Sequence, residues 1–167
     1  MTDVVAVHER GDVLRFAFDD ALRYAGPHSP AGVAIGFKVL QRAFDVLSPD
    51  APPERRSITV RTAFRGPGAR NAVEAVTRAV TDGRFTVDRG LLRVDRGRLL
   101  EDFVFEVAVG GPVLTLLLRD GFVTDEFIDL ARVADRTDAQ EHRLDGLKAQ
   151  LAQRVMATPA ADVFELS

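Results

Sequence analysis

A histidine and a serine stand directly before a predicted helix in the first quarter of the chain. His28 and Ser29 follow Gly26-Pro27 and precede Pro30. Histidine as a residue type ionises near neutral pH, so His28 suits general acid–base chemistry. Ser29 suits a helix N-cap, and Pro30 suits the first helical position. We predict that His28 handles a proton and that Ser29 contacts a ligand. The structural alternative is a plain cap.

A second segment has the same design, a predicted strand that passes through a glycine turn into a helix. The turn Gly66-Pro67-Gly68 is flanked by Arg65 and Arg70, and arginine suits bidentate recognition of a carboxylate or phosphate. Asn71 and Glu74 are three residues apart and share a helical face. The lysine and hydroxyl pair of a nucleotide-binding loop does not follow these glycines. We predict an anion-binding loop, with a tight turn and solvated arginines as the alternative.

The two segments predict one pocket if the fold brings the loops 26–29 and 65–70 together. Tyr24 and Glu74 would then orient His28 or share protons with it, as the other members of a catalytic group. The predicted ligand-binding residues are Ser29, Arg65, Arg70 and Asn71. Two helix N-termini facing one cavity would make it electropositive. The expected ligand is therefore a small acidic or carbonyl-bearing molecule.

Together these segments resemble the formylmethanofuran dehydrogenase E-subunit family, whose first motif reads His-Gly-His-x-Cys-Pro-Gly-x-x-x-Gly before a helix. Residues 28–36, His-Ser-Pro-Ala-Gly-Val-Ala-Ile-Gly, are similar to that motif from its second histidine onward. Gly26 stands in place of the first histidine, and Pro30 stands in place of the cysteine. Asn-Ala-Val-Glu at 71–74 is similar to the Asp-Ala-Ile-Gln of the family's second motif. The resemblance covers about residues 20 to 118.

The resemblance implies an α+β domain, a homodimer and a pocket between the two motifs. Many members of the family hold a metal through histidine and cysteine. Of those ligands only His28 is present in this chain, and the family's C-terminal zinc ribbon is absent. The resemblance therefore implies a divergent member that keeps the cavity without the thiol chemistry, and we expect no metal site.

The elements that must position these loops begin with a predicted hairpin, strands 4–7 and 13–18. Asp19 is the expected cap of a short helix that ends at Gly26. The next helix, after Ser29, carries apolar residues at helical spacing: Val33, Phe37, Leu40, Phe44 and Leu47. A strand over 58–64 and a helix over 69–81 follow.

The second half of the chain predicts a meander and a C-terminal helical extension. Strands are expected at 85–88, 91–95, 100–109 and 113–119, and short connections favour antiparallel pairing. The extension begins at about residue 124, with Thr124 as a cap. Its last helix carries a narrow apolar stripe: Leu144, Leu147, Leu151 and Val155. The stripe predicts a homodimer interface, or packing on the chain's own sheet. The predicted fold is one α+β domain over 1–167, with an antiparallel sheet packed against several helices.

Composition excludes several classes of function. Hydrophobic residues make up 46% of the 167 residues and charged residues 28%, values typical of a globular domain. The net charge is −3, and acidic residues interrupt the basic stretches, so nucleic-acid binding is not expected. The chain has no cysteine, which excludes disulfides, thiol nucleophiles and thiolate zinc sites. The three histidines are widely spaced and form no local metal motif.

The sequence also bears on location. No apolar run approaches the roughly 20 residues needed to cross a bilayer, so no membrane partner is expected. The first residues lack the pattern of a signal peptide, which makes the cytoplasm the expected compartment.

The predicted function is a small-molecule enzyme with non-thiol acid–base chemistry in the pocket between the two loops. A biosynthetic role in specialised or one-carbon-related metabolism is expected from the resemblance and from an arginine-rich, lysine-poor composition typical of GC-rich genomes. Two alternatives stay open: a non-catalytic metabolite-binding or accessory protein, and a structural component that assembles through the helix 144–155. No residue pattern indicates a particular cofactor.

Overall fold

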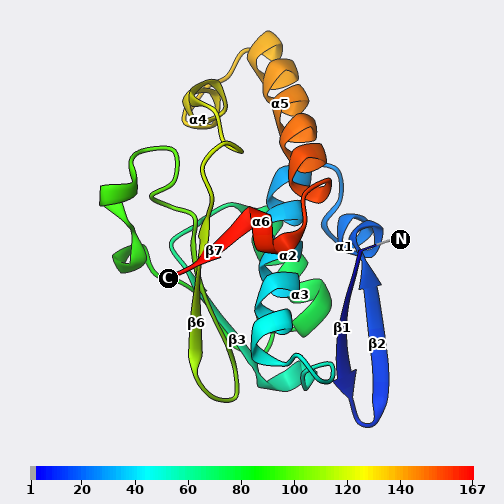
Figure 1. Ribbon diagram of the computed structural model, residues 1–167. Coiled ribbons are helices and arrows are strands. Elements are labelled where there is room, and N and C mark those ends of the chain that lie inside the picture. Colours follow the sequence, from blue (N-terminus) through cyan, green and yellow to red (C-terminus); the bar gives the residue numbers. More distant parts are fainter. Residues whose placement is uncertain (1–2) are drawn as a thin grey trace.

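The computed structural model describes residues 3–167, which fold into an α+β structure (Figure 1). The strands are β1 (Val4–Glu9), β2 (Asp12–Ala17), β3 (Ile58–Thr62), β4 (Phe85–Val87), β5 (Val104–Val109), β6 (Val113–Leu118) and β7 (Phe164–Leu166). The helices are α1 (Phe18–Ala25), α2 (Pro30–Leu47), α3 (Pro67–Thr77), α4 (Asp125–Ala131), α5 (Asp138–Met156) and α6 (Ala160–Val163).

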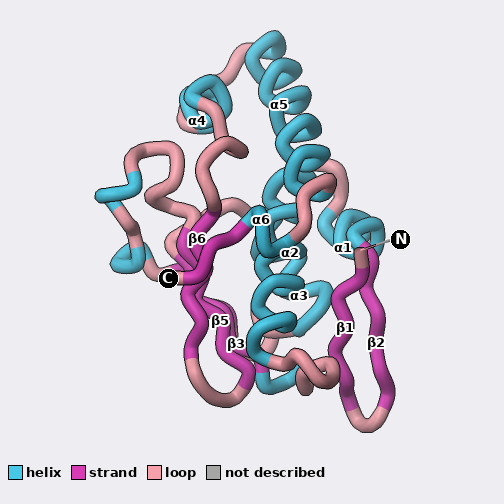
Figure 2. Tube along the Cα trace, viewed as in Figure 1, coloured by secondary structure: helices cyan, strands magenta, loops and turns pink. Residues whose placement is uncertain are grey.

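The strands form two separate sheets. β1 and β2 make an antiparallel hairpin, and the second sheet has the order β4-β3-β5-β6-β7. In this second sheet β3 pairs with β4 in parallel, while its other pairs are antiparallel. The sheet is therefore mixed, and the predicted antiparallel sheet is wrong at this edge, because α3 carries the chain back to the starting end of β3 before β4 begins. The five-stranded sheet and the hairpin lie on opposite sides of α2 (Figure 2). The α2 helix is therefore the central element, with the sheet on one side and β1 on the other.

Helix α2 is buried on almost all of its surface. Its apolar stripe contributes Val33, Phe37 and Leu40, each 0% exposed, to the core. Ile35, Val39 and Ala43 lie on the helix's other faces and are also buried. A helix that is hydrophobic all round is expected to lie inside a domain. Because α2 is held on all sides, the position of its N-terminus, and of His28 and Ser29 directly before it, is fixed relative to the core.

Three glycines let α2 and α3 approach closely. A Cβ on Gly36 would lie 2.8 Å from the Ala69 carbonyl oxygen, and one on Gly32 would lie 3.0 Å from the Cα of Gly68. A Cβ on Gly68 would meet the Ser29 carbonyl oxygen at 2.5 Å. Gly32 faces Gly68, and Gly36, one turn further along α2, faces Ala69 and Ala72, which lie further along α3. The two helices therefore run in the same direction. Their N-termini therefore lie side by side.

The C-terminal part of the chain packs onto α2 and then rejoins the sheet. Thr124 accepts a hydrogen bond from the Phe127 N–H at 3.2 Å, and Thr137 accepts one from the Gln140 N–H at 3.1 Å, so both serve as N-caps. The four stripe residues on α5 are buried within the chain, and α5 packs against α2. The tail docks, because Val163 and Phe164 are 0% exposed and β7 pairs with β6.

The α+β prediction, the N-terminal hairpin and the hairpin of β5 and β6 are confirmed. Several local predictions were wrong. Residues 91–95 form no strand but lie between short 3₁₀ turns at Arg89–Leu91 and Val94–Arg96, so the simple meander is interrupted. Helix α1 begins one residue before Asp19, and Asp20 instead accepts from the Ala17 N–H at 2.7 Å.

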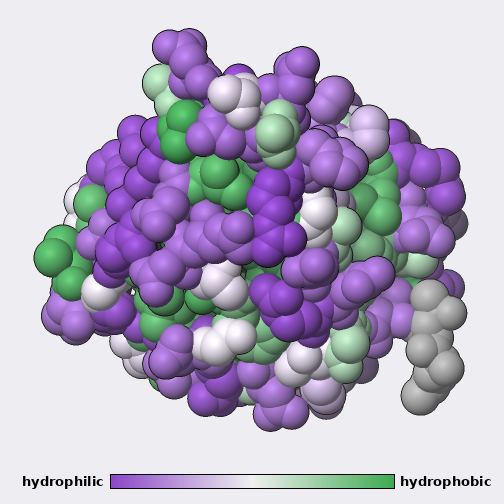
Figure 3. Space-filling view, turned by 90° about the horizontal axis from the view of Figure 1, so that it is seen from above, coloured by the Kyte–Doolittle hydropathy of each residue, from purple (hydrophilic) through white to green (hydrophobic). Residues whose placement is uncertain are grey.

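The homodimer prediction loses the surface on which it was based. The stripe on α5 is buried within the chain itself, where α5 packs against α2 and α4. Seen from above, hydrophilic residues cover most of the face in view, and hydrophobic side chains appear there only in small separate groups (Figure 3). A dimer would therefore need a surface other than the stripe.

Candidate functional site

The two predicted loops meet at one cavity. Ser29 and Gly32 from the start of α2 line it together with Gly66 and Gly68 from the start of α3, and its volume is about 260 Å³. The rest of the wall comes from Phe64, Ala31, Pro67, Phe127, Ala131 and Lys148. We call this space the junction cavity. Its position agrees with the convergence of loops that the sequence predicts.

Both helix N-termini at the junction cavity lack a side-chain cap. Neither Ser29 at the start of α2 nor Gly66 at the start of α3 provides a side-chain cap hydrogen bond. Ser29 is the N-cap residue of α2 and Pro30 follows it, as predicted, but the expected side-chain hydrogen bond is not formed. The Ser29 ψ of 56° departs from the extended backbone that lets a capping hydroxyl reach the first turn. Because the first N–H groups of a helix have no partner within it, both N-termini keep donors for another acceptor.

Lys148 is the ionisable side chain in the wall of the junction cavity. Its Nζ donates a hydrogen bond to the backbone carbonyl of His28 at 3.1 Å. Lys148 comes from α5, so the C-terminal extension closes the cavity and fixes the loop before α2. The ammonium adds positive charge beside two helix N-termini, which carry partial positive charge themselves.

The predicted catalytic residues are divided between different surroundings. His28 and Tyr24 are exposed, and Tyr24 is 57% exposed. Tyr24 and Glu74 line a separate cavity of about 290 Å³, together with Arg55, Ala75, Arg78 and Thr81. This second cavity and the junction cavity share no wall residue. His28 lies beside Ser29 in the chain but is not part of either wall.

Glu74 is occupied by the turn that follows α3. Its carboxylate accepts hydrogen bonds from the backbone N–H groups of Val80 at 3.0 Å and Thr81 at 3.1 Å, and from the Thr81 hydroxyl. Arg78 lies 4.0 Å away. Burial raises the pKa of the Glu74 carboxyl, but the hydrogen bonds from Thr81 and Val80 and the charge of Arg78 outweigh it, so the pKa is lowered overall. This geometry gives Glu74 a structural role at the end of α3.

The remaining predicted ligand-binding residues lie around the start of α3. Arg65 and Arg70 are exposed, and Asn71 is half-buried. None of the three belongs to the wall of the junction cavity. Ser29 is therefore the predicted site residue that the structure places in that wall.

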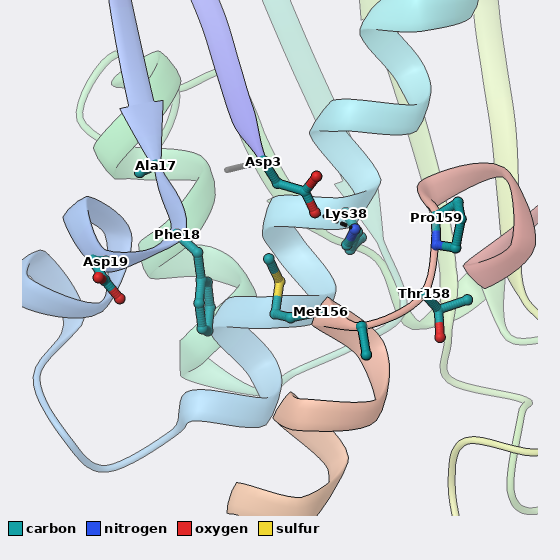
Figure 4. A pocket seen from close by; sticks show the side chains of 9 residues that line it. Asp3, Ala17, Phe18, Asp19, Lys38, Met156, Thr158 and Pro159 are labelled. Atoms are coloured by element: carbon teal, nitrogen blue, oxygen red, sulfur yellow. Dashed lines mark hydrogen bonds and ion pairs between the residues drawn. The ribbon is translucent and has the colours of Figure 1, made fainter. Parts of the chain in front are cut away.

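Sequence reasoning missed a buried lysine in the middle of α2. Lys38 is 1% exposed, and its Nζ lies 2.7 Å from the Asp3 carboxylate. It lines a cavity of about 540 Å³ between the β2–α1 junction and the segment that joins α5 to α6 (Figure 4). The sequence holds only a partial signal, because Lys38 is the one charged residue between Pro30 and Leu40.

Within residues 3–167, no group of three or more histidine, aspartate or glutamate side chains is arranged to hold a metal ion. In the same part of the chain, every helix is too short or too polar to span a membrane. Compared with models of known protein families and with curated proteins, the chain matches neither a family nor a curated relative.

Proposed function

We propose that this chain binds a small acidic or carbonyl-bearing molecule in the junction cavity. The observation that carries the proposal is the meeting of two uncapped helix N-termini in the wall of one cavity. Their backbone N–H groups are suited to the oxygen atoms of a carboxylate or carbonyl. Phe64 and Phe127 offer apolar surface to the rest of such a ligand, and Lys148 adds a positive charge.

Parallel packing of α2 and α3 gives this arrangement a physical reason to take an anion. Two neighbouring N-termini place two partial positive charges side by side, which is unfavourable unless a negative group lies between them. Two of the three glycines that permit the close approach, Gly32 and Gly68, also line the cavity, where they present backbone without a side chain. The chain itself supplies no side-chain cap to either end.

A titration with benzoate, a carboxylate on an apolar ring, tests this proposal by amide NMR. We expect saturable shifts in the amide signals of Gly32, Gly68 and Ala69 as benzoate binds. Ser29→Asp places a carboxylate at the entrance to α2 and should abolish these shifts, whereas Ser29→Ala should retain them. Shifts that persist equally in Ser29→Asp, or a parent protein that shows none, would contradict the proposal.

An acid–base enzyme is the second candidate, and it is favoured by the place of His28 next to a wall residue. His28 is exposed, and its backbone carbonyl is held by Lys148. If His28 moves a proton of the bound molecule, His28→Ala should fold normally and bind benzoate as the parent does, yet lose about 10²- to 10⁴-fold in turnover. Unchanged turnover in His28→Ala would remove His28 from the chemistry, whereas a parent protein without turnover would leave the chain as a non-catalytic binding or accessory protein.

Membership of a divergent branch of the formylmethanofuran dehydrogenase E-subunit family belongs to the same proposal. Its support is the resemblance of residues 28–36 and 71–74, which lie on the two helices that adjoin the junction cavity. With it we propose a homodimer and a biosynthetic role. A cytoplasmic location is proposed with them. Light scattering that returns a monomer mass would overturn the dimer.

A further inference from the structure

Lys38 is a charged side chain with little solvent and few partners. It is 1% exposed and lies between Phe37 and Val39, which are 0% exposed. A lysine ammonium has three N–H donors. Among residues 3–167, the structure gives its Nζ one acceptor, the carboxylate of Asp3 at 2.7 Å. A buried charge needs a partner and satisfied hydrogen bonds, so Lys38 has capacity for a further oxygen acceptor.

The partner of Lys38 is held much more loosely than Lys38 itself. The Asp3 side chain is 40% exposed, and Asp3 lies just before β1 rather than within it. In Figure 4 the Asp3 carboxylate points toward the end of the Lys38 side chain from the N-terminal side. Asp3 lies outside the pairing of β1 with β2, which begins at Val4, so its departure from Lys38 would break no pair of the hairpin.

The cavity beside this ion pair is large enough for a small organic molecule and is mainly apolar. Its volume is about 540 Å³, within the range of roughly 300–1,000 Å³ typical of ligand sites. Phe18 lines one side, and Met156 and Pro159 line the other (Figure 4). The Thr158 hydroxyl is occupied, because it donates to the Arg154 carbonyl at 2.7 Å. The site thus combines a buried cation with apolar side chains, and a second acidic residue, Asp19, stands in the wall beside Phe18.

We propose that this cavity binds a small organic carboxylate with an apolar body, which takes the place of Asp3 on Lys38. The contact with Asp3 shows that the Lys38 ammonium can donate to a carboxylate at this place. Exchange of one carboxylate for another keeps the buried pair neutral, whereas an added carboxylate beside Asp3 would leave a net negative charge. The apolar walls then distinguish a ligand with a hydrocarbon body from a simple anion.

Hexanoate binding to the parent protein, Asp3→Ala and Lys38→Met tests the exchange. Removal of Asp3 removes the competing carboxylate, so Asp3→Ala should bind hexanoate at least 10-fold more tightly than the parent. Lys38→Met should lose the saturable hexanoate shifts of the Phe18 and Met156 amide signals, which report on this cavity. Arg15→Met, which removes an exposed positive charge outside both cavities, should keep these shifts as the parent does. With lysine-selective labelling, hexanoate should shift the Nζ signal of Lys38 in the parent, and at lower concentration in Asp3→Ala.

Chemical rescue gives a second measurement that stands even if Lys38→Met fails to fold. In Asp3→Ala, Lys38 has lost its carboxylate acceptor, so the melting temperature of this variant should be lower than that of the parent. Hexanoate should restore the loss, whereas hexanol should not, because it carries no charge. Equal affinity of the parent and Asp3→Ala, hexanoate shifts of Phe18 and Met156 retained in Lys38→Met, or rescue by acetate as strong as by hexanoate would each overturn the proposal. The junction cavity is unaffected by these outcomes, since it shares no wall residue with this site.

Discussion

Glu74 illustrates how a residue with the right chemistry can be committed to structure. Its spacing from Asn71 and its place after a glycine turn predict a site residue. In the fold, its carboxylate instead satisfies two backbone N–H groups and a hydroxyl beyond the end of α3. Sequence spacing identifies the helical face of Glu74, but only the path of the chain after α3 decides what that face meets.

Glu74→Ala should destabilise the protein by about 1–3 kcal/mol, because the Val80 and Thr81 N–H groups lose their acceptor in a half-buried turn. Arg78→Ala is the matched control. Arg78 is exposed and lies 4.0 Å from Glu74, so its loss should cost less than about 0.5 kcal/mol. Urea unfolding measures both. Benzoate affinity should be unchanged in Glu74→Ala, and a large loss of affinity would restore Glu74 to the binding site.

At the scale of elements, the contact of α2 and α3 decides where the junction cavity forms. The sequence leaves open whether Gly32 and Gly36 serve close packing or make room for a ligand. Close packing of the two helices accounts for Gly36, because its missing Cβ would meet backbone atoms of Ala69. Gly32 serves both purposes, since it contacts Gly68 and also lines the cavity.

Gly36→Ala should destabilise the fold by about 1–3 kcal/mol, because the added methyl group would overlap backbone atoms that cannot move independently. Gly146→Ala on α5 provides the opposite case. A Cβ there has no neighbour within 4 Å, and alanine is the better helix former, so stability should rise by about 0.5–1 kcal/mol. Thermal or urea unfolding of the pair distinguishes packing from propensity. A Gly36→Ala protein that is as stable as the parent would show that α2 and α3 can move apart without cost.

Element prediction succeeds where a pattern is local and fails where pairing is distant. The stripe from Val33 to Leu47 is enough to predict α2, and Thr124 is enough to predict the start of α4. Flanking turn residues predict a strand over 91–95, but Asp88 accepts from the Gly90 N–H and begins a 3₁₀ turn instead. Strand β7 has only three residues, too few for an alternating pattern, and its partner β6 is distant in sequence. Neither feature can be recognised from the residues around β7.

The same limit applies to the candidate site. The sequence shows two similar loop-to-helix junctions and leads to the hypothesis that they converge, but it holds no signal for their distance; residues at the starts of both helices share one cavity in the structure. The contribution of Lys148 is not predictable, because α5 is far from α2 in sequence and only tertiary packing brings them together. The burial of Lys38 is also hard to foresee. A single apolar stripe describes one face of α2, whereas burial on every face of the helix depends on the sheet and the hairpin together.

At the scale of the whole molecule, arginine–carboxylate pairs connect distant elements and make stability depend on pH. Hydrogen bonds from Arg55 and Arg56 lower the pKa of Glu9, and those from Arg84 and Arg56 lower the pKa of Asp82. The Gly90 N–H and Arg61 lower the pKa of Asp88. Each lowered pKa means that the folded state binds protons less readily than the unfolded chain.

Stability should therefore be nearly constant from pH 7 to about pH 5.5 and should fall as acid titrates these carboxylates. Their contribution is fully present above the ordinary pKa values of 4.5 for glutamate and 3.8 for aspartate, and it is lost as the pH drops through the lower values of the folded state. Urea unfolding at a series of pH values between 7 and 3 measures this. A free energy of unfolding that stays constant or rises below pH 4 would contradict the assignment.

A crystal structure of the protein soaked with benzoate tests the central claim most directly. We predict density for benzoate in the junction cavity, with its carboxylate within hydrogen-bond distance of backbone N–H groups at the starts of α2 and α3. The ring should lie toward Phe64 and Phe127, and the density should be absent from Ser29→Asp crystals soaked in the same way. Benzoate found only beside Lys38, or an empty junction cavity at saturating benzoate, would contradict the account.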